Sequence, residues 1–168
     1  MGSDKIWLFD TTLRDGGQTR GVDFSRADKV AIAHALDDIG IDYIEAGWPG
    51  ANPTDDAFFA KPPKMKNAKL VSFGMTRRGG RSTANDPGLS AVIDAEVDAS
   101  CLVGKTWDFH VKTALNTTLD ENLEMIRQSL IAAAARGRET MFDFEHLFDG
   151  YKTKPHFALT RIRSAKAS

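Results

Sequence analysis

An arginine and an aspartate stand side by side early in the chain, as Arg14 and Asp15 in the segment FDTTLRDGGQ. The apolar run before them predicts a β-strand, and Gly16 and Gly17 after them predict a loop. A carboxylate held at a strand end can bind a hard divalent cation through oxygen. A guanidinium beside it can stabilise negative charge that develops on a substrate oxygen. The pair therefore indicates a site for chemistry at the end of the first strand.

Three more acidic residues are expected toward strand ends: Glu45 on the second strand, and Asp143 and Glu145 near the end of the fifth. Loops at the carboxyl ends of parallel strands converge, so these residues favour one shared site. Glu45 could orient Arg14 or move a proton. The alternative is that Arg14 and Glu45 form a buried ion pair and that Asp15 caps a turn. Considered one residue at a time, both interpretations stay open.

Short apolar runs alternate with longer amphipathic segments, and this pattern is typical of repeated βα units. Strands are expected at residues 6–13, 41–48, 70–75, from 100 to 103 and at 140–144. Helices are expected from Ser25 to Gly40, at 55–59, at 89–95, from Thr118 to Gly137 and from Pro155 onward. Ser25 and Thr118 each stand three residues before an acid, which is typical of a helix start.

Five βα units in a row, without a linker, predict a single α/β domain over residues 1–168. An open doubly wound sheet and part of a (β/α)8 barrel both fit this pattern. The periodicity alone does not choose between them.

Composition narrows the class of protein. The 168 residues are 42% hydrophobic and 27% charged with a net charge of −1, so we expect a soluble globular protein without a nucleic-acid or membrane partner. Cys101 is the single cysteine, which excludes an internal disulfide. The beginning of the chain has no signal-peptide pattern, and we expect a cytoplasmic location.

Four segments carry a resemblance to a known family: FDTTLRDGGQ, IDYIEAGWPGANPTD, VGKTWDFHV and FDFEHLFDGYK. Together they resemble the N-terminal part of the (R)-citramalate synthases, which belong with isopropylmalate and homocitrate synthases to the DRE-TIM metallolyases. The resemblance runs from about Ile6 to Leu159. It implies a partial (β/α)8 TIM barrel made of about the first five βα units.

The resemblance also implies roles for single residues. Asp15 would be a ligand of a divalent metal (Mg, Mn or Zn), Arg14 would stabilise an enolate or alkoxide oxygen, and Glu45 would be the third signature residue. A second set is implied to bind substrate, namely Gln18, Asp143 and Glu145, although at Asp143 relatives often carry serine.

The implied reaction is the condensation of acetyl-CoA with pyruvate to citramalate and CoA, a step of isoleucine biosynthesis. A sister activity, isopropylmalate or homocitrate synthase, would keep this chemistry and change the keto acid. The residues do not identify the base that removes the acetyl proton.

The chain also departs from the family pattern. It lacks the His-x-His pair that completes the metal site, and its histidines are isolated in sequence: His34, His110, His146 and His156. We interpret each as a structural or surface histidine, and His146, beside Glu145, is the best alternative candidate for a metal ligand. A complete barrel needs about 250 residues, so we expect a truncated chain that binds metal weakly. A non-catalytic fragment or partner subunit is therefore an alternative function.

An incomplete barrel also predicts exposed strand edges, and hence a homo-oligomer or association through those edges. The cluster of arginines and glycines at residues 77–81 could bind the phosphates of CoA, but a solvated basic loop explains it more simply.

Overall fold

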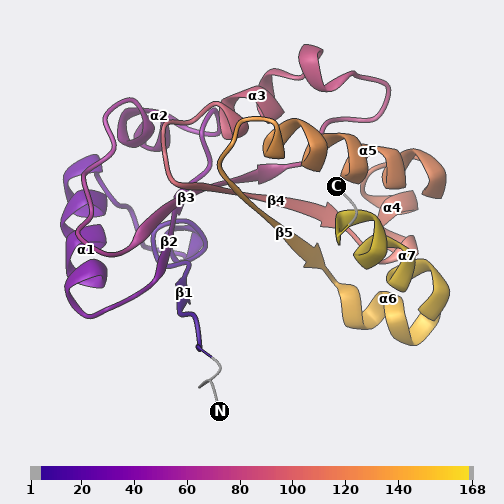
Figure 1. The fold of residues 1–168 in the computed structure, drawn as a ribbon, viewed down its shortest axis with the longest axis horizontal. Helices are drawn as coiled ribbons and strands as arrows, with labels where there is room; N and C mark the ends of the chain where they lie inside the picture. The colour runs from indigo at the N-terminus through magenta and orange to yellow at the C-terminus, as the bar shows by residue number, and fades with distance from the viewer. Residues whose placement is uncertain (1–4, 167–168) are drawn as a thin grey trace. The chain divides into compact units, whose positions relative to one another are not determined.

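The computed structural model describes residues 5–166, in which strands and helices alternate along the chain (Figure 1). The strands are β1 (Phe9–Asp10), β2 (Tyr43–Gly47), β3 (Lys69–Met75), β4 (Ala99–Lys105) and β5 (Glu139–Glu145). The helices are α1 (Arg26–Asp38), α2 (Pro53–Phe59), α3 (Pro87–Ile93), α4 (Asp108–Thr113), α5 (Leu119–Ala134), α6 (Leu147–Thr153) and α7 (Pro155–Lys166). No helix in this range is long and apolar enough to cross a membrane.

The strands are hydrogen-bonded in the order β1-β2-β3-β4-β5, which is their order along the chain. The pairs β1/β2 and β2/β3 are parallel. A doubly wound sheet reverses its strand order at a switch point, whereas a (β/α)8 barrel adds each strand beside the previous one. The topology confirms the predicted α/β fold with the first five βα units of a barrel.

The chain divides into two compact units. The first unit contains the residues up to Phe73 together with Ala95–Ala99, and the second contains Gly74–Asp94 and the residues from Ser100 onward. They are described separately below.

The core of the first unit joins β2 to its helices. Ile44 and Ala46 on β2 are fully buried and belong to one cluster with Ala33 of α1 and Phe58 of α2. Because side chains alternate across a strand, the residue between them, Glu45, points to the opposite face. Burial of the apolar face thus determines the direction of the acidic side chain.

The two predicted capping signals differ in outcome. The Ser25 side chain accepts from the Asp28 N–H, and the Asp28 carboxylate accepts from the Ser25 N–H at 2.9 Å, so α1 begins with a complete capping box. Thr118 likewise accepts from the Glu121 N–H at 3.1 Å. The Glu121 carboxylate, however, binds Arg77, because a buried guanidinium is the stronger partner.

The second unit is built around α5. Ile126 and Leu130, four positions apart, are buried, and Leu119 and Leu123 on the same face are half-buried, as expected for the amphipathic segment predicted here. On β4, Leu102 and Val103 are also buried.

The first predicted strand is wrong at both ends. Only Phe9–Asp10 is strand, and Ile6 is 81% exposed. Beyond Asp10 the chain turns, because the Thr11 carbonyl accepts from the N–H groups of Arg14, Asp15 and Gly16. This turn ends the strand and carries Arg14 back over the sheet end.

Three smaller expectations also fail. Ile39, which lies within the helix predicted to run to Gly40, follows the last residue of α1 and is 74% exposed. Residues 108–113 and 147–153, for which the sequence predicts no helix, form the short helices α4 and α6. Two turns of helix are too short to show an apolar periodicity in the sequence.

Candidate active site

Arg14, in the turn after β1, forms an ion pair with Glu45, in the middle of β2. The Arg14 Nε donates to Glu45 Oε1 at 2.6 Å, and Glu45 is only 2% exposed. The Arg14 Nη1 also donates to Asp15 Oδ1 at 3.0 Å, and the Asp15 side chain is 62% exposed. The structure therefore brings the three signature residues together, with one cation between a buried and an exposed carboxylate.

Aromatic packing fixes the guanidinium of Arg14. It lies 3.9 Å from the centre of the Phe73 ring, a cation-π contact. Phe73 in turn meets the Trp48 ring edge-on, with ring centres 5.8 Å apart. Because Arg14 is held by an ion pair and a ring face, it presents positive charge in one orientation, as a group that stabilises an oxyanion must.

The alternative interpretation is partly observed. The buried ion pair between Arg14 and Glu45 exists. Asp15 precedes the short 3₁₀ turn η1 (Gly16–Gln18), but its side chain makes no capping hydrogen bond there. The Asp15 carboxylate is thus not used to hold the turn, and it faces solvent beside Arg14.

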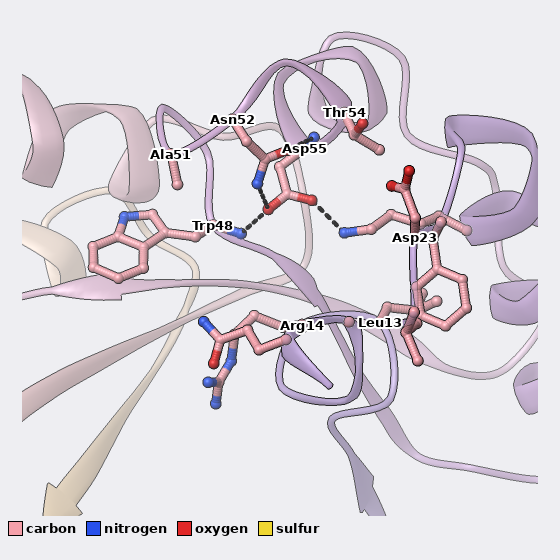
Figure 2. Close-up of a pocket in the computed structure, with 13 residues that line it drawn as sticks. Leu13, Arg14, Asp23, Trp48, Ala51, Asn52, Thr54 and Asp55 are labelled. Carbon is pink, nitrogen blue, oxygen red and sulfur yellow. Dashed lines mark hydrogen bonds and ion pairs between the residues drawn. The ribbon is translucent and has the colours of Figure 1, made fainter. Parts of the chain in front are cut away.

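A cavity of about 200 Å³ adjoins this group in the first unit (Figure 2). Arg14 and Gln18 both line it, so the structure brings the predicted loop glutamine to the predicted arginine. The opposite wall comes from residues 48–55, which follow β2.

A second ion pair at this cavity was not anticipated from the sequence. Lys29 of α1 and Asp55 of α2 are each 5% exposed and bind one another. Lys29 Nζ also donates to the Ala46 carbonyl at 2.9 Å, and Asp55 Oδ2 accepts from the Trp48 N–H and the Asn52 amide at 2.9 Å each. In Figure 2 dashed lines join the carboxylate of Asp55 to both of these donors.

Helical spacing could have revealed this pair. Lys29 lies three and four positions before Ile32 and Ala33, on the face that α1 turns to the core. A lysine on such a face needs a buried partner. The position of that partner, Asp55 in the segment ANPTD, depends on how α2 folds back.

Gly47 allows the Asp55 carboxylate to approach the end of β2. Its φ is +152°, and a Cβ built there would lie 2.6 Å from Asp55 Oδ1. Any other residue would push the carboxylate away from the Trp48 N–H. The glycine in the segment EAGWPG is therefore required by the close packing of Asp55.

The other two predicted substrate residues lie on β5 in the second unit. Glu145 binds Lys105 at the end of β4, and Asp143 is exposed. That Asp143 and Glu145 share one site with Arg14 stays a prediction.

The histidines are less isolated than the sequence indicated. In the second unit the His110 and His146 rings lie 4.5 Å apart and edge-on, because the segments after β4 and β5 meet. His146 Nδ1 lies 3.2 Å from Asp149 Oδ2, and His110 Nδ1 is buried without a hydrogen-bond partner. Within residues 5–166, no three histidine, cysteine or acidic side chains are arranged to hold a metal.

A divalent cation therefore does not find a complete site in the described residues. Mg²⁺ and Mn²⁺ need several oxygen or imidazole ligands, and Zn²⁺ needs at least three protein ligands. Asp15 would supply one oxygen ligand, already in contact with Arg14.

The arginine cluster after β3 is mainly structural. Arg77 is 4% exposed, and its guanidinium donates to Glu121 at 2.7 Å and to Gln128 at 2.9 Å. Arg78, by contrast, is exposed. The guanidinium of Arg77 is thus hydrogen-bonded to α5 and does not point into solvent where a phosphate could bind it.

Comparison with known proteins agrees with the resemblance seen in the sequence motifs. The family model described as HMGL-like matches residues 5–167. The (R)-citramalate synthase of Aquifex aeolicus is 50% identical over 97% of this chain, and the homocitrate synthase AksA of Methanopyrus kandleri is 33% identical over 97%. The chain spans 31% of the first relative and 38% of the second.

Among solved structures, the HMG-CoA lyase of Bacillus subtilis matches with a TM-score of 0.63 and 19% identity. The match covers 82% of this chain and 45% of the lyase. At this identity the likeness speaks for the fold alone, and it agrees with the barrel topology of the strands. The resemblance seen in the sequence motifs is confirmed by the synthase comparison.

Proposed function

Because this chain belongs to the HMGL-like family, we propose that its Arg14 site serves the condensation of acetyl-CoA with pyruvate, as in an (R)-citramalate synthase. The observation that carries this proposal is the group formed by Arg14, Asp15 and Glu45, in a chain 50% identical to such a synthase over 97% of its length. The lower identity to a homocitrate synthase, 33%, supports pyruvate as the keto acid.

In the proposed reaction the acetyl methyl group loses a proton, and the resulting carbanion attacks the ketone carbon of pyruvate. A carbon–carbon bond forms, the ketone oxygen gains the negative charge and then a proton, and water cleaves the thioester to release CoA. Arg14 would face that oxygen. Glu45 would hold the guanidinium through Nε, so that its outer edge, where Nη1 also donates to Asp15, would face the substrate.

The remaining roles follow the family resemblance. Asp15 would contribute one ligand to a divalent metal that polarises the ketone when bound. Gln18, Asp143 and Glu145 would contact substrate. This proposal treats both compact units as parts of one catalytic domain and places the protein in the cytoplasm, consistent with a buried free Cys101.

The test uses the chain itself and a chimera in which residues 5–167 replace the matched part of the Aquifex aeolicus synthase. Pyruvate-dependent release of CoA is measured with Mn²⁺, against a blank for the thiol of Cys101. We expect the chimera to be active, and Arg14→Ala to lower its kcat by roughly 100-fold or more. Arg78→Ala, which removes an exposed arginine, serves as the matched control.

Each outcome distinguishes the alternatives. Preference for 2-oxoglutarate or 2-oxoisovalerate over pyruvate would replace the proposal with the sister activity. A chimera that folds but releases no CoA would favour the non-catalytic fragment or partner subunit.

A further inference from the structure

The buried ion pair of Lys29 and Asp55 holds the backbone where β2 ends. Lys29 Nζ donates to the Ala46 carbonyl, and Asp55 Oδ2 accepts from the Trp48 N–H, both at 2.9 Å. The pair thus binds one backbone group on each side of Gly47. Lys29 and Asp55 are each 5% exposed, so water competes little for these bonds. The pair therefore fixes the path of the chain across the strand end.

The same stretch of backbone is irregular. Glu45 and Gly47 pair with successive residues of β3, so Ala46 between them is an extra residue on β2. A bulge of this kind disrupts the ladder locally and changes the direction of neighbouring side chains. Lys29 supplies the donor that the Ala46 carbonyl binds. The direction of Glu45, the residue before the bulge, therefore depends on a bond from outside the sheet.

Two contacts lead from this stretch to Arg14. On one side, Glu45 Oε1 accepts from Arg14 Nε at 2.6 Å. On the other side, the Trp48 ring meets the Phe73 ring edge-on, and the Phe73 ring lies 3.9 Å from the guanidinium. In Figure 2 Asp55 and Arg14 lie on opposite sides of Trp48. The carboxylate and the ring that hold Arg14 thus both follow the backbone that the buried pair fixes.

We propose that Lys29 and Asp55 are positioning residues for Arg14, which set the orientation of its guanidinium through the end of β2. Stability alone does not explain the pair, because apolar residues in place of a buried ion pair are often equally stable. An apolar pair, however, could not bind the Ala46 carbonyl and the Trp48 N–H. The catalytic meaning of this orientation rests on the proposed function, whereas the orientation itself does not.

The first experiment measures the reaction of Arg14 with phenylglyoxal, which modifies accessible guanidinium groups, by peptide mass spectrometry. In the parent chain the Arg14 side chain is 16% exposed and held, so it should react slowly. The double variant Lys29→Met/Asp55→Leu leaves no buried charge but lacks both backbone bonds. It should stay folded by circular dichroism, and Arg14 should react roughly tenfold faster, because the strand end opens locally.

The other arginine of α1 provides an internal control. Arg26 donates to the Ala57 and Lys61 carbonyls, at α2 and just after it, and not to the end of β2. Its rate should therefore be the same in the parent chain and in the double variant. Acceleration of Arg14 and Arg26 by the same factor would mean that the unit loosens as a whole, and it would overturn the proposal.

Two further variants separate orientation from stability. Lys29→Met/Asp55→Asn is also uncharged but keeps an oxygen for the backbone N–H at the strand end, so Arg14 should react more slowly than in the leucine variant. Asp37→Asn weakens the first unit elsewhere, because Asp37 binds the backbone of residues 66–68. It should leave the rate of Arg14 unchanged. Equal rates in the parent chain and the leucine variant, or equal acceleration by Asp37→Asn, would overturn the proposal.

The catalytic consequence is measured in the chimera with the Aquifex aeolicus synthase. Lys29→Met/Asp55→Leu should lower its kcat for CoA release by roughly tenfold or more, since a displaced transition-state group costs rate. An unchanged kcat in an active chimera would overturn the positioning role. A parent chimera without activity would count against the proposed function alone, because the modification rates of Arg14 are measured without substrate.

Discussion

The guanidinium Nε of Arg14 lies 2.6 Å from Oε1 of Glu45, a residue 31 positions away in sequence. The contact joins the turn after β1 to the buried face of β2. It uses Nε rather than an outer nitrogen of the guanidinium, while the outer nitrogen Nη1 donates to Asp15 Oδ1 at 3.0 Å. The pair therefore both stabilises the first unit and orients Arg14.

Glu45→Ala is expected to destabilise the first unit strongly. Arg14 would lose the partner of its largely buried guanidinium, and removal of one member of a buried pair costs about 3–5 kcal/mol. Urea unfolding would measure this loss. Asp15→Ala is the matched comparison, because the Asp15 side chain is 62% exposed. Its contact with Arg14 should be worth at most about 1 kcal/mol. Equal losses in the two variants would contradict the assignment of Glu45 as the structural partner.

Gly47→Ala should also be costly. The added methyl group would lie 2.6 Å from Asp55 Oδ1 at a residue with φ of +152°. Overpacking of this kind costs about 1–3 kcal/mol beyond the backbone strain. Gly40→Ala separates the two effects, because Gly40 has φ of +90° with nothing within 4 Å of its Cβ position. Thermal or urea unfolding that ranks Gly40→Ala as the more damaging change would argue against the packing explanation.

Lys29→Met tests the buried pair beside the cavity. The variant keeps the side-chain length but leaves the Asp55 carboxylate buried without its cation, so unfolding free energy should fall by about 3–5 kcal/mol. Adding Asp55→Asn should recover part of this loss, because the neutral amide no longer needs a cation. A double variant that shows the sum of two independent losses would indicate that the residues do not interact.

Arg77→Ala should destabilise the second unit, because Arg77 is 4% exposed and donates to both Glu121 and Gln128. Glu121 keeps partial contact with solvent, so we expect about 1–3 kcal/mol rather than the full cost of a buried pair. Arg78→Ala, an exposed neighbour, should change stability little. A larger effect of Arg78→Ala would mean that the guanidinium of Arg77 does not hold the loop to α5.

Lowering the pH should lower the stability of the first unit, because Asp37 becomes protonated. Burial alone would raise the pKa of Asp37, but hydrogen bonds from the backbone N–H groups of Lys66, Ala68 and Asn67 hold that pKa below its ordinary value of 3.8. Because the pKa of Asp37 is lower in the folded than in the unfolded chain, its carboxylate stabilises the fold at a pH above the unfolded pKa. This stabilisation is lost as the pH falls below about 4. Urea midpoints between about pH 5 and pH 3 should fall less steeply for Asp37→Asn than for the parent chain. Identical slopes would show that Asp37 does not contribute to acid sensitivity.

Much of the fold was predictable because its signals are local. Ser25 with Asp28, the apolar spacing along α5 and the glycine after α1 each act within a few residues. The helices α4 and α6 escaped prediction because two turns show no period. The first strand was predicted too long because its apolar residues are exposed on an edge, and hydrophobicity alone does not separate an edge from a core.

The sequence by itself determined the alternation of five βα units, and it placed Arg14, Asp15 and Glu45 toward strand ends. Both follow from strand periodicity and turn residues, which depend only on residues close together in the chain. The tertiary structure decided the rest. It chose the barrel order of the strands, joined Arg14 to Glu45, buried Lys29 against Asp55 and brought His110 to His146. These contacts join residues far apart in sequence, and they depend on which faces pack together.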